Sequence, residues 1–269
     1  MGVLNGKVAF VTGAARAQGR SHAEGLAAQG ADIIAFDLCA EATPVNYPPA
    51  TPADLAETVR LVEAAGRRIV ARIGDVRDQA ALDQTVADGV AALGHLDIVV
   101  ANAGVSSWGR FWEMPEERWL ATIDINLTGA WRTLRAVAPV LIEQGTGGSI
   151  ITICSVAGLK ALPGQAHYTA AKHGLVGLTR SAAIELGPYG IRVNSLHPWG
   201  VDTPMAHDPD VTGILTAHPT YAASFGSILT DPPVAAPADI TDAVIFLASD
   251  AARRITGAAL PVDMGATVV

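Results

Sequence analysis

A chain of 269 residues has the length of one large α/β domain or of two small domains. Half of its residues are hydrophobic but only 5 % are aromatic, so aliphatic side chains dominate, as in helices packed on a buried parallel sheet. The formal net charge of -8 and the lack of a basic cluster argue against a nucleic-acid partner, and no apolar run reaches the roughly 18 residues of a membrane span.

Short apolar runs alternate along the chain with longer segments of helical period. The runs predict strands over residues 7–12, 32–37, 68–73, 96–101, 149–154, 191–196 and 259–262. The longer segments predict helices over residues 20–29, 55–65, 80–93, around 119–143, 168–186 and 240–249. This alternation predicts a single doubly wound α/β domain, whose parallel sheet has right-handed crossovers and helices on both faces.

A glycine-rich turn, Thr-Gly-Ala-Ala-Arg-Ala-Gln-Gly over residues 12–19, joins the first strand to the first helix. Such a turn lets the backbone approach a pyrophosphate, and the helix N-terminus directs N–H groups at it. The motif alone is a weak signal for a dinucleotide, but its position between strand and helix strengthens it. The residues predicted to contact the dinucleotide here are Gly13, Arg16, Ala17, Gln18 and Gly19.

Asp37 ends the second strand about 20 residues beyond the turn, where a carboxylate can accept hydrogen bonds from the adenosine ribose. A carboxylate there repels a 2′-phosphate, whereas Arg16 would attract one. We give Asp37 more weight and predict NAD as the cofactor, with Leu38 beside it. A strand-end cap is the alternative role for Asp37.

Two later loops also follow strands at the edge where doubly wound sheets bind ligands. Asp75 and Val76 follow the third strand and are predicted to hold the adenine. Asn102, Ala103 and Gly104 follow the fourth strand and leave the backbone room beside the cofactor. Each pair or triplet alone is equally consistent with ordinary turn chemistry.

The predicted chemistry lies further along the chain. Ser155 follows the fifth strand, and Tyr168 and Lys172 share one face of the next helix, a turn apart. A tyrosine of pKa about 10 needs help to act as a base, and a nearby ammonium supplies it by stabilising the phenolate. We expect Tyr168 to exchange a proton with an alcohol or ketone and Ser155 to orient its oxygen. Asn126 is expected to bind a water or a backbone carbonyl and so connect Lys172 to solvent.

Taken together, these pieces resemble the short-chain dehydrogenase/reductase family in order and spacing over essentially the whole chain. The family's Asn-Ser-Tyr-Lys tetrad corresponds to Asn126, Ser155, Tyr168 and Lys172. The resemblance implies a seven-stranded Rossmann-like sheet, a dinucleotide-binding half over about residues 1–110, a catalytic half over about 111–269, and usually a homotetramer. It also implies cofactor contacts from Tyr168, Lys172, Pro198, Val201 and Thr203. One departure is Ala17, which stands at the middle glycine of the family's turn and is tolerable if that residue is already helical.

A narrower resemblance is to the mycofactocin-associated, carveol-dehydrogenase-like branch of the family. It rests on Gly-Arg-Ser-His-Ala over residues 19–23, on the insertion after Cys39, on the segment from His197 to Met205 and on the C-terminal stretch 260–266. The resemblance implies a dinucleotide that stays bound and is reoxidised through mycofactocin, a peptide-derived redox carrier. The insertion, residues 39–53, carries Tyr47 and is stiffened by prolines, so we expect it to cover that dinucleotide; these prolines are Pro44, Pro48, Pro49 and Pro52.

The residues flanking these motifs are mostly apolar and predict the wall of a substrate pocket: Trp108, Trp112, Leu159, Trp199 and Met205. No arginine or lysine stands among them, which favours a small neutral secondary alcohol or ketone. The long connection over residues 197–238 supplies part of this pocket. Two rival functions remain: a nucleotide-sugar epimerase, which is typically longer, and a redox-sensing binding protein, which has no need of the tetrad.

The remaining expectations are negative. Cys39 and Cys154 lie far apart in sequence and are expected to be buried free thiols. The seven histidines form no metal-binding pair, so no metal site is expected. Residues 1–7 contain no cationic leader or apolar run, and we expect a cytoplasmic protein.

Overall fold

The structure is a computed structural model, and it describes residues 2–43 and 45–269. Pro44, one of the prolines expected to stiffen the insertion, lies outside the described residues. The seven strands form one parallel sheet in the order β3-β2-β1-β4-β5-β6-β7. The strands are β1 Val8–Thr12, β2 Asp32–Asp37, β3 Ile69–Ile73, β4 Ile98–Ala101, β5 Gly148–Ile153, β6 Ile191–Pro198 and β7 Ala259–Val262.

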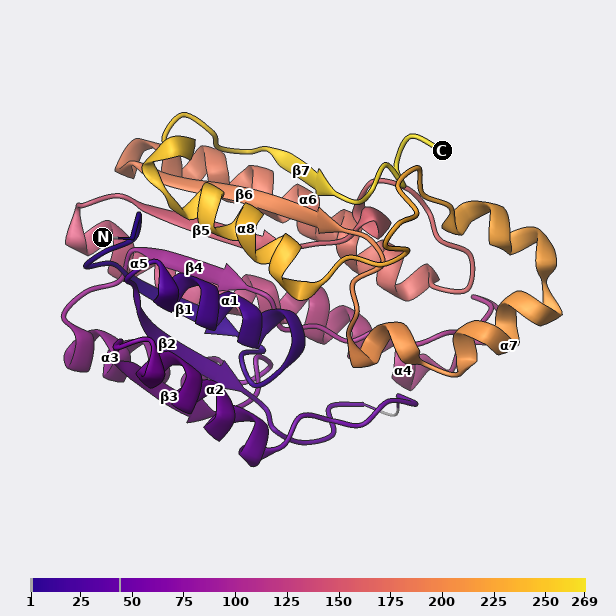
Figure 1. Cartoon of the computed structure of the whole chain (residues 1–269), viewed down its shortest axis with the longest axis horizontal. Coiled ribbons are helices and arrows are strands. Elements are labelled where there is room, and N and C mark those ends of the chain that lie inside the picture. The colour runs from indigo at the N-terminus through magenta and orange to yellow at the C-terminus, as the bar shows by residue number, and fades with distance from the viewer. Residues whose placement is uncertain (1, 44) are drawn as a thin grey trace.

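Helices cover both faces of the sheet, as Figure 1 shows. They are α1 Ala17–Ala28, α2 Pro52–Ala64, α3 Gln79–Leu93, α4 Glu116–Ile123, α5 Ala130–Gln144, α6 Ala166–Leu186, α7 Asp210–Ala217 and α8 Pro237–Ala248. α1 packs between α2 and α8 on one face, while α3, α5 and α6 pack side by side on the other. Each face buries its own apolar cluster, one with Leu26 and Val244 and the other with Val86 and Val137. The predicted doubly wound fold is therefore confirmed.

The largest departure from the predicted elements is in the helix expected around residues 119–143. It forms as α4 and α5 joined by a π-helical turn, η1, over Asp124–Gly129. A π-turn inserts an extra residue in the helical ladder, and such insertions are frequent at functional sites. Periodicity could not show this break, because α4 and α5 keep an apolar face on either side of the turn.

Helix capping explains why α2 and α3 begin before the starts predicted from the apolar pattern. α2 begins at Pro52, three residues before the predicted start, because Thr51 and Asp54 form a capping box in which each side chain accepts from the other's backbone N–H. α3 begins after Asp78, whose side chain accepts from the N–H of Ala81. α3 ends at Leu93, as predicted, because the next residue, Gly94, has the left-handed backbone that favours glycine.

All strands point toward one edge of the sheet, and both long connections lie there (Figure 1). The strand order reverses between β1 and β4, the position at which doubly wound sheets open a crevice for a ligand. The insertion, residues 39–53, leaves β2 at this edge, and the connection after β6 contains α7 and the 3-10 turns η4, Pro204–His207, and η5, Pro219–Phe225.

The described residues also bear on the cysteines, on membrane-spanning helices and on metal-binding groups. Cys39 and Cys154 are both buried and free, as predicted. Within residues 2–43 and 45–269, no helix is both long and apolar enough to cross a membrane. The same residues hold no group of three or more His, Cys, Asp or Glu side chains placed to bind a metal ion.

Candidate active site

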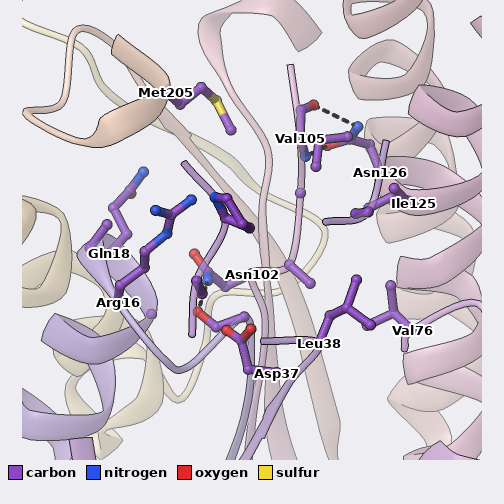
Figure 2. A pocket seen from close by; sticks show the side chains of 18 of the residues that line it. Arg16, Gln18, Asp37, Leu38, Val76, Asn102, Val105, Ile125, Asn126 and Met205 are labelled. Atoms are coloured by element: carbon purple, nitrogen blue, oxygen red, sulfur yellow. Dashed lines mark hydrogen bonds between the residues drawn. The ribbon is translucent and has the colours of Figure 1, made fainter. Parts of the chain in front are cut away.

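A cavity of about 390 Å³ opens at the carboxyl edge, between β1 and β4. That volume lies in the range of small-molecule sites. Most residues predicted to contact the dinucleotide line it, namely Gly13, Arg16, Ala17, Gln18, Gly19, Asp37, Leu38, Asp75, Val76, Asn102, Ala103, Gly104, Tyr168, Lys172 and Thr203. Pro198 and Val201 do not line it: Pro198 ends β6, and Val201 is buried in the core, where it pairs with Ala235. Figure 2 shows Arg16 and Gln18 on one side of the cavity and Val76 and Ile125 on the other.

The glycine turn is held open by its neighbours. The amide of Asn102 donates to the carbonyl oxygens of Thr12 and Gly13, and the Thr12 hydroxyl accepts the N–H groups of Asn102 and Ala103. A Cβ on Gly19 would stand 1.8 Å from the carbonyl oxygen of Gly13, so no other residue fits where the helix meets the turn. Asn102 therefore shapes the phosphate-binding turn through its side chain, a role beyond the contact predicted from sequence.

Ala17 has a φ of +49°, in the left-handed region. The right-handed helical state that would make alanine tolerable at this glycine position is therefore not the one it adopts. A left-handed alanine costs about 1–2 kcal/mol, and its methyl group lies at the cavity wall. The departure from the family pattern is real and carries local strain.

Asp37 is buried at the end of β2, with each carboxylate oxygen accepting one backbone N–H. Oδ2 accepts from Ala15 in the glycine turn at 2.9 Å, and Oδ1 accepts from Cys39 at 2.9 Å. A carboxylate oxygen has more than one acceptor direction, so these bonds leave Asp37 able to accept from a ribose hydroxyl. Asp37 thus caps the end of the strand and supports the glycine turn. The strand-end cap and the ribose contact, which the sequence left as alternatives, are therefore compatible with each other.

Asp75 lies at the cavity in an ion pair with Arg77. The Arg77 side chain donates to both Asp75 oxygens and also to the carbonyl oxygen of Ala42 in the insertion. Burial raises the pKa of Asp75, but the hydrogen bonds and charge of Arg77 outweigh it and lower the pKa below its usual value. Arg77 was not predicted from sequence, since no motif distinguishes it from a solvated arginine.

The insertion forms part of the cavity wall. Its residues in the lining are Ala40, Glu41, Ala42, Val45, Tyr47, Pro49 and Ala50. The Tyr47 hydroxyl accepts the N–H of Ser106, beyond β4, at 3.1 Å, and Asn46 donates to Asp210 on α7 at 2.6 Å. With the bond from Arg77 to Ala42, the insertion is tied to three different segments around the cavity.

Asn126 lies in the π-turn η1 and is buried. Its amide donates to the carbonyl oxygens of Val105 and Thr122 at 2.9 Å, and its Oδ1 accepts the N–H of Val105 (Figure 2). Asn126 thus binds backbone carbonyls, but those of Val105 and Thr122, and its predicted connection of Lys172 to solvent stays a prediction. These bonds fix the loop that follows β4, which borders the cavity.

Ser155 lies two residues after the end of β5, and two of its polar groups are held by hydrogen bonds. Its Oγ accepts the N–H of Ala157 at 3.1 Å, and its carbonyl oxygen accepts from the His197 ring at 2.7 Å. With that Oγ lone pair occupied by an N–H, the hydroxyl hydrogen remains available to another oxygen. His197 thus supports Ser155 through its main chain, whereas the sequence indicated His197 only as part of a family resemblance.

Tyr168 and Lys172 lie one turn apart on α6, as predicted, and both line the cavity. The Lys172 ammonium lies 5.4 Å from the Tyr168 ring centroid and donates to the carbonyl oxygen of Ile153 at 2.8 Å. Burial raises the pKa of Tyr168, although its interaction with the Ser155 side chain lowers it, and burial also lowers the pKa of Lys172. In the protein alone the Tyr168 pKa is therefore raised above its usual value, because desolvation of the buried phenol outweighs the interaction with Ser155.

The predicted substrate-pocket residues divide into three groups. Met205 lines the cavity, and Trp108 and Trp199 pack on either side of Phe225 in an aromatic cluster. Leu159 and Trp112 are exposed. A cation also lies nearby, contrary to the sequence argument: Lys160 is 5.8 Å from the Trp199 ring centroid, but it donates to the carbonyl oxygen of Ala266.

The loop after β4 is tied to the start of α6 by side chains that the sequence did not mark. Gln165 donates to the Ser106 hydroxyl at 2.8 Å, and the His167 ring bonds the Ser107 hydroxyl at 2.8 Å. Both residues precede Tyr168: Gln165 is the N-cap residue of α6, and His167 lies in its first turn. Their roles depend on contacts between segments about 60 residues apart, which no local pattern reveals.

Comparisons with known proteins agree with this geometry. A family profile described as Enoyl-(Acyl carrier protein) reductase matches residues 13–267. The chain is 55 % identical to an uncharacterised NAD-dependent oxidoreductase of Mycobacterium tuberculosis over 98 % of its own length and 97 % of that protein. The chain belongs to the short-chain dehydrogenase/reductase family. This membership confirms the resemblance read from the sequence motifs.

Two other similar proteins are named for carveol. The chain is 43 % identical to a (-)-trans-carveol dehydrogenase of Rhodococcus erythropolis, over the full length of both proteins. It is 45 % identical to a carveol dehydrogenase of Mycobacterium avium solved in complex with NAD, with a TM-score of 0.94 and full coverage of both chains. Within the family, the relatives that resemble this chain thus include enzymes named for an alicyclic secondary alcohol.

Proposed function

We propose that the protein is an NAD-dependent dehydrogenase that interconverts a small secondary alcohol and its ketone. The observation that carries this proposal is that Tyr168 and Lys172 line the cavity one helical turn apart, with the Ser155 side chain in an interaction that lowers the Tyr168 pKa. The cradle also fits NAD: the glycine turn leaves the N-terminus of α1 uncapped by a side chain, and Asp37 ends β2 beside it. NAD, when bound, accepts or donates the hydride.

The residues around the reacting oxygen have separate tasks. The Tyr168 phenolate takes the hydroxyl proton of the alcohol during oxidation, and the resulting phenol returns it to the ketone oxygen during reduction. The Ser155 hydroxyl orients the same oxygen. Lys172 holds a positive charge one turn away, and Asn126 fixes the loop after β4 that borders the site. The dinucleotide is held by the turn from Gly13 to Gly19, by Asp37 and by the residues of the β3 and β4 loops.

We propose a neutral, carveol-like alicyclic alcohol as substrate. Met205 and the cluster of Trp108, Trp199 and Phe225 support an apolar pocket, and Lys160 already donates to a backbone carbonyl. The carveol-named relatives support the same class. The test is a screen of cyclohexanol, carveol and a carboxylated cyclohexanol with purified protein. Turnover of the neutral alcohols supports the proposal. Turnover of the acid alone contradicts it and would indicate that Lys160 binds the substrate's carboxylate.

We also propose that the bound NAD exchanges slowly and is reoxidised through the peptide-derived carrier mycofactocin. The three ties of the insertion support slow exchange, because the dinucleotide could leave only after the insertion opens. The alternative is a family member with freely exchanging NAD or NADP. The test is to denature the purified protein, assay the supernatant for NAD and measure exchange with labelled NAD. Tyr47→Phe, which loses only the hydroxyl that accepts from Ser106, should speed exchange. Rapid exchange in the unmodified protein, or fast turnover on free NAD without another acceptor, would refute this part.

We also propose how the protein assembles and where it works. Exposed apolar side chains gather on α4 and α5, among them Trp119, Leu120 and Trp131. This unpartnered surface supports the homotetramer that the family resemblance implies. Light scattering of the purified protein tests it, with a monomer as the contradicting result. We further propose that the protein works in the cytoplasm, which fractionation of the source cells tests.

A further inference from the structure

Phe225 stands between two indole rings beside the proposed site. Its ring centroid lies 5.5 Å from that of Trp108 and 5.9 Å from that of Trp199. These distances are typical of favourable aromatic contacts. The three rings come from segments far apart in sequence: the loop after β4, the end of β6 and the 3-10 turn η5. Phe225 therefore joins the long connection after β6 to the fixed body of the protein.

The aromatic cluster lies against the residues that carry the chemistry. Trp199, Phe225 and Tyr168 all pack against one small buried group. That group consists of Val156, Ala157, Leu162 and Ala266. Since Val156 and Ala157 directly follow Ser155, the cluster borders both Ser155 and Tyr168. The rings of Trp199 and Phe225 therefore lie next to the residues that are proposed to act on the carbinol carbon.

Phe225 closes a segment that has few other attachments. We call residues 204–226 the lid segment. Within the described residues, every backbone hydrogen bond of the lid segment outside its helices stays between residues 203 and 226. The remaining ties are side-chain contacts, including the Asn46–Asp210 bond and the packing of Ile214 close to Gly164. Trp108 and Trp199, in contrast, lie in segments whose backbone is bonded to other parts of the protein. Gly109, next to Trp108, donates its N–H to the carbonyl oxygen of Gly164, and Trp199 donates its N–H to that of Val262.

We infer that Phe225 is a specificity-determining residue, which latches the lid segment by inserting between Trp108 and Trp199 and so limits the bulk of the alcohol that reaches Tyr168. This inference rests on the proposed alcohol dehydrogenase function. The other two rings are held by the body of the protein, so the size of Phe225 decides how much space the closed lid leaves. Small alicyclic alcohols fit beneath the latch, and bulkier ones require it to open.

The test compares Phe225→Ala with the unmodified enzyme on cyclohexanol and on the bulkier carveol. The variant should raise the kcat/KM ratio of carveol to cyclohexanol by about 10-fold or more, the scale at which one misfitted group discriminates substrates. NAD affinity should stay within about twofold. Phe225→Leu keeps an apolar latch and should fall between the two proteins. It also serves as the test variant if Phe225→Ala does not fold by circular dichroism.

Phe111→Ala is the matched control, because Phe111 is 69 % exposed and its ring contacts only Trp112 among the aromatic residues described. It should leave the substrate ratio unchanged. A second readout needs no substrate: acrylamide should quench tryptophan fluorescence more strongly in Phe225→Ala, because Trp108 and Trp199 lose their cover. The control for this readout is Phe246→Ala, which should leave the quenching unchanged, because Phe246 lies on α8, is 40 % exposed and contacts no tryptophan ring among the aromatic pairs of the described residues.

The outcomes separate the two proposals. If the unmodified enzyme oxidises either alcohol but Phe225→Ala leaves both the substrate ratio and the quenching unchanged, the inference about Phe225 is wrong and the dehydrogenase stands. If the unmodified enzyme oxidises no alcohol, the proposed function fails. In that case unchanged quenching also rejects the latch, and increased quenching retains it as a property of the lid segment.

Discussion

The imidazole of His197 donates its Nδ1 hydrogen to the main-chain carbonyl oxygen of Ser155, across 2.7 Å. The direction is fixed because a carbonyl can only accept, so a neutral ring must accept at Nε2, where the Ser195 hydroxyl lies 2.9 Å away. Burial lowers the pKa of His197 to about 4, so the ring is neutral at physiological pH. The end of β6 thereby positions a residue at the end of β5.

We predict that His197→Ala lowers kcat for alcohol oxidation by about 10- to 100-fold, because a misplacement of about 1 Å at a reacting group has an effect of that order. NAD affinity should remain within about twofold. His197→Asn can still donate to the Ser155 carbonyl and should recover part of the loss, while Ser195→Ala should affect kcat little. Equal losses in His197→Ala and His197→Asn would indicate a purely structural role, and a change in KM alone would indicate that Ser155 is not misplaced.

Tyr168→Phe removes the oxygen that exchanges the proton and keeps the volume of the ring. We predict a fall in turnover of at least about 100-fold, the usual contribution of general acid–base catalysis. Calorimetric titration should give nearly unchanged NAD binding. Retention of the wild-type rate would reject the proton route through Tyr168.

The raised pKa of Tyr168 gives the two reaction directions different pH dependences. Burial is the main cause of the rise, so the phenol is protonated at neutral pH. Oxidation needs the phenolate and should become faster as pH rises from 7 to 9. Ketone reduction needs the protonated phenol and should gain nothing over that range. Initial rates in both directions in one buffer series check this, and an oxidation rate that is flat across the range would contradict it.

Three fully buried histidines make the fold sensitive to acid. They are His22, His167 and His197, and burial lowers their pKa values to about 3, about 4 and about 4. Unfolded histidines have a pKa near 6.5, so between about pH 4 and 6.5 the unfolded chain binds more protons than the folded chain. Stability is fully present above that window and is lost as pH falls through it.

Each histidine should add up to about 1.4 kcal/mol per pH unit to the slope of the unfolding free energy near pH 5. Urea denaturation at several pH values and one protein concentration measures that slope. His22→Gln should reduce it by about one histidine's share. His207→Gln, which changes an exposed histidine, is the control and should leave the slope unchanged. A slope that does not respond to His22→Gln would show that His22 is protonated in the folded protein.

The sheet was predictable from sequence because a parallel strand buried on both faces is a continuous apolar run, as β1 and β2 are. The glycine turn and the Tyr168–Lys172 pair were predictable because their geometry is local: a turn that a Cβ would block at Gly19, and two side chains one helical turn apart. The side chains that hold the site in place were not predictable from the sequence. His197 reaches Ser155, and Tyr47 reaches Ser106, only after segments 42 and 59 residues apart have folded together.

Electrostatics also depend on the folded environment. The sequence showed a lysine beside a tyrosine and so predicted a lowered phenol pKa, but it could not show that burial of Tyr168 raises that pKa. Nor could it show that Ala17 adopts a left-handed backbone, since alanine in that position usually continues a right-handed helix.

The cofactor preference should depend on Asp37. Its carboxylate lies at the cavity beside the glycine turn, where a 2′-phosphate would meet a like charge. We predict that the wild-type protein binds NAD far more tightly than NADP and that Asp37→Ser shifts the ratio toward NADP by about 10- to 100-fold, measured by titration. Asp37 also accepts the backbone N–H groups of Ala15 and Cys39, so Asp37→Ser should weaken NAD binding as well.

Asp37→Asn separates these two effects, because it removes the charge but keeps one acceptor oxygen for the turn. If charge repulsion sets the preference, Asp37→Asn should gain nearly as much NADP affinity as Asp37→Ser while losing less NAD affinity. Arg16 lines the same cavity and would then attract the 2′-phosphate, so adding Arg16→Ala to Asp37→Ser should cancel most of the gain. Equal affinity of the wild-type protein for NAD and NADP would remove the role assigned to Asp37. A gain that survives the loss of Arg16 would instead show that removing repulsion is sufficient.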